Sequence, residues 1–197
     1  KLALLENLVT KVDGLVLGGG MANTFLLAEG KSIGASLAEP DMVGIAQRIM
    51  DVATSNDCKI FLPKDVVVAV EFKLGASYRI AKIDDVADGE MILDAGPEAI
   101  AAAGGFLQAC ATTVWNGPMG AFEIPPFDAA TTALAKIVAA ETQNNGVMSV
   151  AGGGDTMAAL ANAGVNDQFS YVSTAGGAFL EWLEGKRLPG VEALING

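Results

Sequence analysis

The chain has 197 residues, of which 51% are hydrophobic and 18% charged, so it is long and apolar enough to fold around a substantial core. Its formal net charge of −11 argues against nucleic acid or an anionic membrane as a partner, because both are bound by basic surfaces. Histidine is absent, which excludes Ser-His-Asp and Cys-His catalysis, so any chemistry must rest on positioning and electrostatics.

The cysteines and the lengths of the apolar runs indicate the cellular compartment. Cys58 and Cys110 have no CxxC spacing, and we interpret them as apolar thiols of a protein in a reducing cytosol. No apolar run approaches the roughly 18 residues of a membrane span, and the N-terminus lacks the pattern of a signal peptide. We therefore expect a cytoplasmic protein. Because the chain starts without Met, in what reads as the middle of an element, we also expect a piece of a longer protein.

In the first part of the chain, apolar residues with helical spacing alternate with short apolar runs that end at glycines. Leu2, Leu5 and Val9 share one helical face, and Pro40 suits the first turn of a helix. The turn residues at 75–77 lie between two β-rich runs and favour an antiparallel ribbon. In chain order we expect a helix at 1–11, a strand at 14–17, a glycine turn at 18–20, helices at 21–29 and 39–55, a strand at 59–62, and ribbon strands at 65–72 and 78–83.

The second part of the chain repeats the order of strand, turn and helix. We expect a strand at 90–93, a turn at 94–97, a helix at 98–103, a strand at 112–115, a turn-rich segment at 116–123, a helix at 127–142, an apolar run at 146–151 with a glycine turn at 152–154, a helix from 155, a strand at 169–172, and a helix at 178–184. This order predicts a single three-layer α/β domain, Rossmann-like, with a mainly parallel sheet and helices on both faces. Its ligand should lie outside the carboxyl ends of the strands.

Glycine-rich turns are the main candidate for a functional feature. Turns at 18–20, 152–154 and 176–177 each fall between a strand and a helix, where unpaired N–H groups and the helix dipole attract phosphate. One such turn indicates close helix–strand packing equally well. Three turns on one sheet edge, together with 116–123, predict a single groove for a phosphate-rich ligand. Neither GxGxxG nor GxxxxGK[ST] occurs, which argues against the usual dinucleotide fold, including a nicotinamide dehydrogenase, and against a P-loop enzyme.

Asp155 follows the second of these glycine turns, 152–154, and opens a helix. On spacing alone two interpretations stay open. The carboxylate could be an N-cap, since aspartate is favoured there. Alternatively it could hold a Mg²⁺ ion on nucleotide phosphates, because Mg²⁺ is bound by one or two carboxylates together with substrate phosphates.

Five segments carry a further signal: GGGMANTF at 18–25, WNGPMGAFE at 115–123, GGGDT at 152–156, STAGGA at 173–178 and LEGKRLPGV at 183–191. In order and spacing they resemble the C-terminal, nucleotide-binding half of the phosphoglycerate kinase family. The resemblance covers essentially the whole chain, 1–197, as one domain truncated on its N-terminal side. It implies reversible transfer of a phosphoryl group from 1,3-bisphosphoglycerate to ADP, giving ATP and 3-phosphoglycerate, with Mg²⁺ on the nucleotide.

For the nucleoside, the resemblance implies a set of flanking residues. The glycine turn would pass under the adenine, with Leu37 and Leu93 as apolar walls, although leucines also serve as plain core. Pro118 would pack near the adenosine, and Glu123 would take the ribose hydroxyls unless it is a solvated loop charge. The implied nucleotide-binding set also contains Gly18, Gly19, Gly20, Asn116, Gly120, Ala121, Gly153 and Gly154, with Asn116 meeting the phosphates.

For the phosphates, the resemblance makes Asp155 the Mg²⁺ residue and favours that interpretation over the N-cap. Thr156 would hydrogen-bond the β-phosphate. Gly176 and Gly177 would present amides to the phosphoryl group in transfer, and such preorganised donors stabilise its charge. Lys1 matches the second lysine of the family's GAKxxDK loop and would contact nucleotide phosphate, although a solvated terminal lysine describes it equally well.

Two departures from the family pattern bear on activity. Ala175 stands where the family has the first glycine of a triplet, which would strain a turn that needs φ > 0. The family's N-terminal half, with its basic patch for 3-phosphoglycerate and its catalytic arginine, is missing. We therefore expect a monomer that binds ADP or ATP but is inactive alone and meets 3-phosphoglycerate or 1,3-bisphosphoglycerate only through the missing domain. The alternative is a binding module that works without catalysis.

Overall fold

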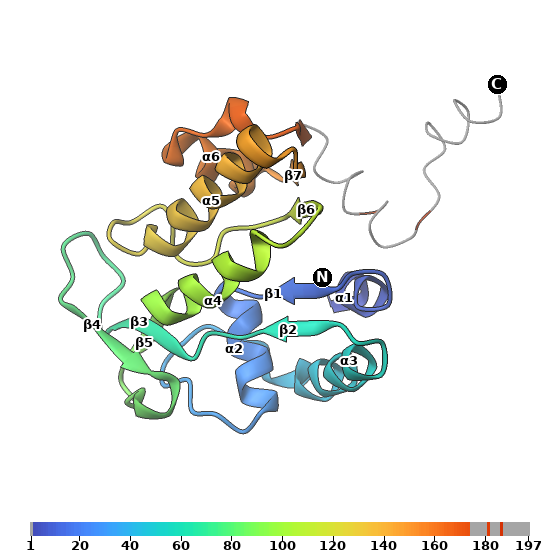
Figure 1. The fold of residues 1–197 in the computed structure, drawn as a ribbon. Coiled ribbons are helices and arrows are strands. Elements are labelled where there is room, and N and C mark those ends of the chain that lie inside the picture. The colour runs from blue at the N-terminus through green and yellow to red at the C-terminus, as the bar shows by residue number, and fades with distance from the viewer. Residues whose placement is uncertain (1, 174–180, 182–185, 187–197) are drawn as a thin grey trace.

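The computed structural model describes residues 2–173 and the single residues 181 and 186, and it shows a mixed α/β chain (Figure 1). Its helices are α1 (Leu2–Leu8), α2 (Gly19–Ala28), α3 (Val43–Ser55), α4 (Pro97–Leu107), α5 (Ala129–Asn145) and α6 (Gly154–Ala163). Its strands are β1 (Gly14–Val16), β2 (Lys59–Phe61), β3 (Asp65–Ala69), β4 (Tyr78–Lys82), β5 (Met91–Ala95), β6 (Thr112–Trp115), β7 (Met148–Gly152) and β8 (Tyr171–Ser173). Short 3-10 helices are η1 (Pro40–Met42), η2 (Ile83–Asp85) and η3 (Asn166–Gln168).

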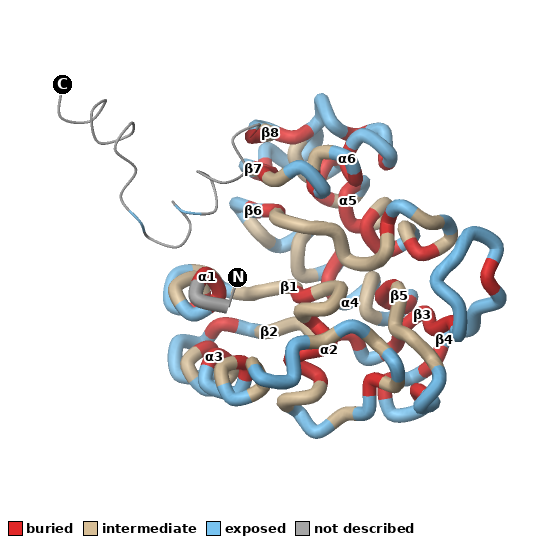
Figure 2. Tube along the Cα trace, turned by 180° about the vertical axis from the view of Figure 1, so that it is seen from behind, coloured by how far each residue is buried: buried red, intermediate tan, exposed pale blue. Residues whose placement is uncertain are grey.

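Within residues 2–173, two of the three sheets are parallel. β1 pairs with β2, and β7 lies between β6 and β8. In Figures 1 and 2 these sheets follow one another in the order β2, β1, β6, β7, β8. The chain therefore winds outward from β1 in one direction and outward from β6 in the other. The crevice where a strand order reverses in this way is the usual ligand site of an α/β sheet.

The third sheet is antiparallel, with β3 between β4 and β5. The antiparallel ribbon predicted for 65–72 and 78–83 is confirmed, although β3 already ends at Ala69. β5 is a third strand of this sheet and runs antiparallel to β3. No crossover helix lies between β3 and β5, and parallel neighbours would need one.

Some element boundaries differ from the sequence-based expectation. β5 continues through Asp94 and Ala95, where a turn was expected, because both residues are buried and pair with β3. The helix expected over 39–55 begins as η1, and the α-helix proper starts only at Val43. α2 already starts at Gly19, inside the predicted glycine turn.

Side chains of β1 and of Leu17, which follows it, alternate between two helical layers. Leu15 and Leu17 face a core cluster built from α1, α2 and α3, in which Val9, Phe25 and Ile49 are completely buried. On the other face, Phe106 of α4 fills the space beside Gly14, and Val16 packs against the cluster under α5 and α6. Figure 2 shows buried stretches running through α2, β3 and α5. This alternation of sides is what a strand buried on both faces requires.

Helices therefore cover both faces of the parallel strands, as the sequence predicts. The predicted Rossmann-like α/β fold with a mainly parallel sheet is confirmed, and the antiparallel sheet of β3, β4 and β5 is appended to it. No helix within residues 2–173 combines the length and the apolar character that crossing a bilayer demands.

Candidate functional site

The turn between β1 and α2 is held against the loop that follows β6. Gly19 has φ +58 and donates its N–H to the carbonyl oxygen of Met119 at 2.8 Å. A Cβ on Gly18 would lie 2.6 Å from Met119 Cα, so only glycine fits this close approach. The first predicted glycine turn therefore meets the predicted turn-rich segment 116–123, and both lie at the carboxyl ends of their strands.

The turn between β7 and α6 is held against the same loop. Asn116 Nδ2 donates to the carbonyl oxygen of Gly152 at 2.6 Å, and Gly117 N–H donates to Thr156 Oγ1 at 2.7 Å. Gly153 adopts φ +106, a conformation that side chains rarely tolerate. Two of the three predicted glycine turns and the loop after β6 are thus joined at one edge, as a single groove requires.

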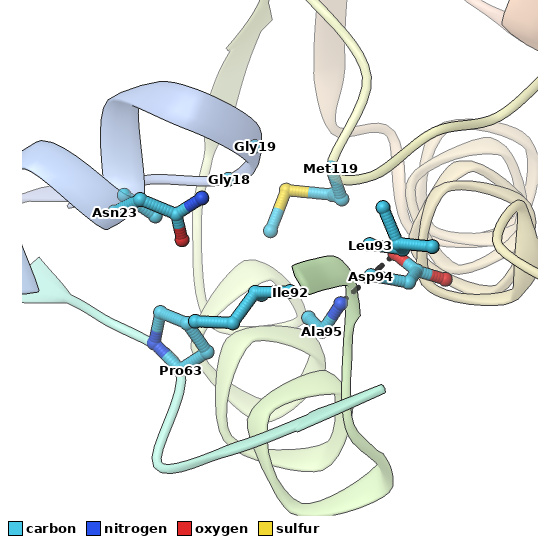
Figure 3. A pocket seen from close by; sticks show the side chains of 10 residues that line it. Gly18, Gly19, Asn23, Pro63, Ile92, Leu93, Asp94, Ala95 and Met119 are labelled. Atoms are coloured by element: carbon cyan, nitrogen blue, oxygen red, sulfur yellow. Dashed lines mark hydrogen bonds between the residues drawn. The ribbon is translucent and has the colours of Figure 1, made fainter. Parts of the chain in front are cut away.

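The predicted apolar walls lie beside the first turn. Leu37 is 81% exposed, so it is not a core residue, and a Cβ on Gly20 would touch its side chain at 3.4 Å. Leu93 is half-buried and accepts a hydrogen bond from Ala121 N–H through its carbonyl oxygen at 2.8 Å. Figure 3 shows Gly18, Gly19, Asn23, Leu93 and Met119 around one hollow, whose other lining residues are Ala22, Pro63, Ile92, Asp94 and Ala95.

The remaining predicted residues occupy the loop after β6 and the start of α6. Pro118, Gly120 and Ala121 are half-buried, and Glu123 is exposed. A Cβ on Gly120 would lie 2.6 Å from the carbonyl oxygen of Leu93, which ties this part of the loop closely to β5. Gly154 is the first residue of α6 and is exposed.

Asp155 is exposed in the first turn of α6. The N-cap of this helix is Gly153, so the interpretation of Asp155 as an N-cap is wrong. Gly153 is the N-cap and Gly154 is the first helical residue, so Asp155 is the second residue of α6. Among the described residues no group of three or more Cys, Asp or Glu side chains could hold a metal by itself. A metal here would depend on Asp155 together with ligand oxygens, which is how Mg²⁺ is bound beside phosphates.

Asp94 supports this edge in a way that the sequence did not indicate. It is 2% exposed, and its carboxylate accepts hydrogen bonds from Ala95 N–H and from Ala130 N–H at the start of α5, both at 2.9 Å. Burial raises the pKa of Asp94 to about 7, the backbone donors oppose this rise, and nearby Asp128 adds to it. The sequence predicts a strand at 90–93 and a turn at 94–97, whereas β5 extends to Ala95 and carries Asp94 as a lone acid among apolar residues.

The phosphoglycerate kinase family model matches residues 1–186. The chain belongs to this family. A phosphoglycerate kinase of Rhodospirillum centenum is 61% identical over 194 residues, which are 98% of this chain and 49% of that relative. One of Xanthobacter autotrophicus is 60% identical over the same shares of the two chains. The chain thus spans about half the length of the curated relatives it matches.

Solved structures of the family share this fold. The phosphoglycerate kinase of Coxiella burnetii matches with a TM-score of 0.93 at 48% identity, over 98% of this chain and 49% of that one. The enzyme of Pyrococcus horikoshii OT3 matches with a TM-score of 0.79 at 27% identity, over 98% and 48%. The family resemblance inferred from the five motifs is therefore confirmed. Lys1, Ala175, Gly176 and Gly177 lie outside the described residues, and their implied roles stay predictions.

Thr156 has a structural role that can be tested. Its side chain is 1% exposed and accepts the N–H of Gly117, so Thr156→Val would leave that donor without its partner. We expect this substitution to lower the free energy of unfolding by about 1–2 kcal/mol in urea denaturation. Thr156→Ser retains the hydroxyl and should lose less. Equal stability of the valine variant and the parent would contradict this role.

Proposed function

We propose that the chain, 1–197, is the C-terminal nucleotide-binding domain of a phosphoglycerate kinase and binds ADP or ATP with Mg²⁺ at the carboxyl edge of its parallel strands. In the proposed reaction the acyl phosphate of 1,3-bisphosphoglycerate passes to ADP, and ATP and 3-phosphoglycerate are formed. One observation carries the proposal. In a member of this family, the loop after β6 is hydrogen-bonded to both described glycine turns.

The physical basis is a local concentration of positive potential. α2 and α6 each have ten residues and begin at these turns, and a helix N-terminus carries about half a positive charge together with unpaired N–H groups. In a chain of net charge −11, an anion must be bound by such local features. We assign the phosphates to the start of α6 and the adenine to the turn before α2, between Leu37 and Leu93.

Asp155 fits the role of the protein's Mg²⁺ ligand, since its carboxylate is exposed in the first turn of α6. When bound, Mg²⁺ would neutralise charge on the phosphates. The residues of the chain would do the rest: backbone amides at the start of α6 bind phosphate oxygens, Asn116 meets the same phosphates, and Glu123 takes the ribose. Binding of phosphoglycerate is assigned to the part of the longer relatives that this chain does not match. Cytoplasmic location and a monomeric state remain predictions from the sequence.

Calorimetric titration with Mg-ADP beside a coupled kinase assay tests the proposal. We expect the chain alone to bind the nucleotide without turnover. Fusion to the part of the Rhodospirillum centenum relative that it does not match should then produce turnover. Binding without turnover in the fusion would favour a binding module. Absence of binding by both proteins would refute the nucleotide site.

Replacement of Asp155 tests the metal assignment. We expect Asp155→Ala to weaken Mg-ADP binding about tenfold, the loss of one charge-assisted contact, while ADP without Mg²⁺ binds as well as before or better. The fold should survive, because Asp155 is exposed. Asp167→Ala, which removes an exposed carboxylate on η3, is the matched control. An Asp155 variant with unchanged Mg²⁺ dependence would show that the metal is held elsewhere.

A further inference from the structure

Asn23 is a buried polar residue beside the groove for which the family resemblance implies no role. It lies in α2, is 2% exposed, and lines the hollow together with Gly18, Ile92 and Met119. Figure 3 shows its amide at the hollow, with the glycine turn on one side and the Met119 side chain opposite. A polar side chain buried this fully normally has hydrogen-bond partners for both ends of its amide.

Only one end of the Asn23 amide has a partner. Nδ2 donates to the carbonyl oxygen of Leu37 at 3.0 Å, whereas Oδ1 is buried with no hydrogen-bond partner. A flipped amide would place two acceptors against each other at Leu37, so the nitrogen must face that carbonyl. Oδ1 is consequently the end of the amide that remains without a donor, in a residue that lines the hollow. An unsatisfied buried acceptor is unfavourable, which points to a donor that arrives with a ligand.

The surroundings of Oδ1 suggest the chemical nature of that donor. Apart from Asn23 and Asp94, the hollow is lined by glycine, alanine, proline, isoleucine, leucine and methionine. Such a lining suits the face and edge of a flat, apolar ring, with the few polar groups setting its orientation. The Asp94 carboxylate is already engaged by the N–H groups of Ala95 and Ala130. Oδ1 of Asn23 is therefore the side-chain acceptor available for a hydrogen bond from an amino group on the ring.

We propose that Asn23 determines base specificity, with Oδ1 accepting a hydrogen bond from the exocyclic 6-amino group of a purine. This assignment rests on the proposed nucleotide site at residues 18–20. The Nδ2 of the same amide donates to the carbonyl oxygen of Leu37, so Asn23 would contact the base through Oδ1 and position Leu37, one apolar wall of the site, through Nδ2. A 6-oxo purine would set its oxygen against Oδ1 and leave both acceptors unpaired, which sites built for a donor reject strongly.

Three diphosphates separate the effect of the amino group from binding in general. ADP carries the 6-amino group, purine riboside 5′-diphosphate carries hydrogen there, and inosine 5′-diphosphate carries oxygen. With Mg²⁺ present, we expect the parent chain to bind ADP about three- to tenfold more tightly than the purine riboside compound, the value of one neutral hydrogen bond. Inosine diphosphate should bind more weakly still.

Two variants then assign the effect to Oδ1. Asn23→Ala removes the acceptor and should bring the ADP to purine riboside diphosphate affinity ratio close to one. Thr24→Val is the matched control, because Thr24 Oγ1 accepts the N–H of Glu39 at 3.0 Å and so holds the same Leu37 segment without touching the base edge. It should weaken all three ligands by a similar factor and leave their ratios unchanged. Circular dichroism verifies that both variants are folded.

The outcomes distinguish this assignment from the proposed function. Equal affinity of the parent for ADP and purine riboside diphosphate would overturn the role of Asn23 while leaving the nucleotide site intact, and this arm needs no variant. A preference for ADP that survives in Asn23→Ala would also overturn it. Failure of all three ligands to bind would overturn the proposed function, and the assignment with it. The proposal is supported if the affinity ratio of ADP to purine riboside diphosphate falls close to one in Asn23→Ala and is unchanged in Thr24→Val.

Discussion

Gly18→Ala should weaken Mg-ADP binding at least tenfold and lower the free energy of unfolding by about 1–3 kcal/mol, the range for overpacking a tight site. The added Cβ would lie 2.6 Å from Met119 Cα and 2.7 Å from its carbonyl oxygen, and neither backbone atom can rotate away. The two loops would have to separate, which stretches the 2.8 Å hydrogen bond from Gly19 N–H to Met119. Calorimetry and urea denaturation measure the two effects.

Gly105→Ala is the control for adding a methyl group elsewhere. Gly105 lies in α4, is exposed, and has no atom within 4 Å of an added Cβ. It should gain stability by about 0.5–1 kcal/mol, because alanine is a better helix former than glycine, and leave nucleotide affinity unchanged. If Gly18→Ala bound Mg-ADP as tightly as Gly105→Ala, the contact between the two loops would not shape the nucleotide site.

Asp94→Asn should abolish a large part of the pH dependence of stability between about pH 4 and 7. Burial raises the pKa of Asp94 from the ordinary 3.8 to about 7 in the folded state, so over this range the folded chain binds the proton that the unfolded chain releases. The contribution of protonated Asp94 is therefore complete below pH 4 and is lost as the pH rises through 7. A pKa difference of about 3 corresponds to on the order of 4 kcal/mol.

Urea denaturation of the parent and of Asp94→Asn at several pH values between 4.5 and 7.5 measures this dependence. Asparagine keeps one acceptor for Ala95 or Ala130 but does not titrate, so the variant should gain stability relative to the parent as the pH rises. Asp167→Asn, at an exposed position, should follow the parent across the whole range. A stability difference between Asp94→Asn and the parent that stays constant with pH would show that Asp94 is ionised in the folded chain throughout.

Local features of the sequence account for most of the elements. The strand–glycine–helix units around 14–28 and 148–163 could be predicted because an apolar run, a glycine turn and a helix-forming segment lie next to one another in the chain. The β3–β4 ribbon could be predicted for the same reason, from two β-rich runs around a short turn. Five motifs in register were enough to indicate the family, since their order and spacing are properties of the chain itself.

Contacts between distant parts of the chain could not be predicted in this way. Asp65 accepts the N–H groups of Glu98 and Ala99 at the start of α4, and Asp94 does the same for α5 from 36 residues away. Each helix is thus capped from a neighbouring strand, whereas rules for capping consider only the residues next to the helix. For this reason the sequence predicts a turn at Asp94, although the residue lies in β5.

The sequence by itself determined the order of strands and helices and the family motifs of this chain, because both depend on residues that are neighbours in the sequence. The joining of two glycine turns by Asn116 and Gly117, the exposed position of Leu37, and the one-sided hydrogen bonding of Asn23 emerged only when the elements packed. The reason is physical. Propensity and periodicity act over a few residues, but burial and hydrogen-bond satisfaction depend on which surfaces meet, and the groove lies where surfaces from several elements meet.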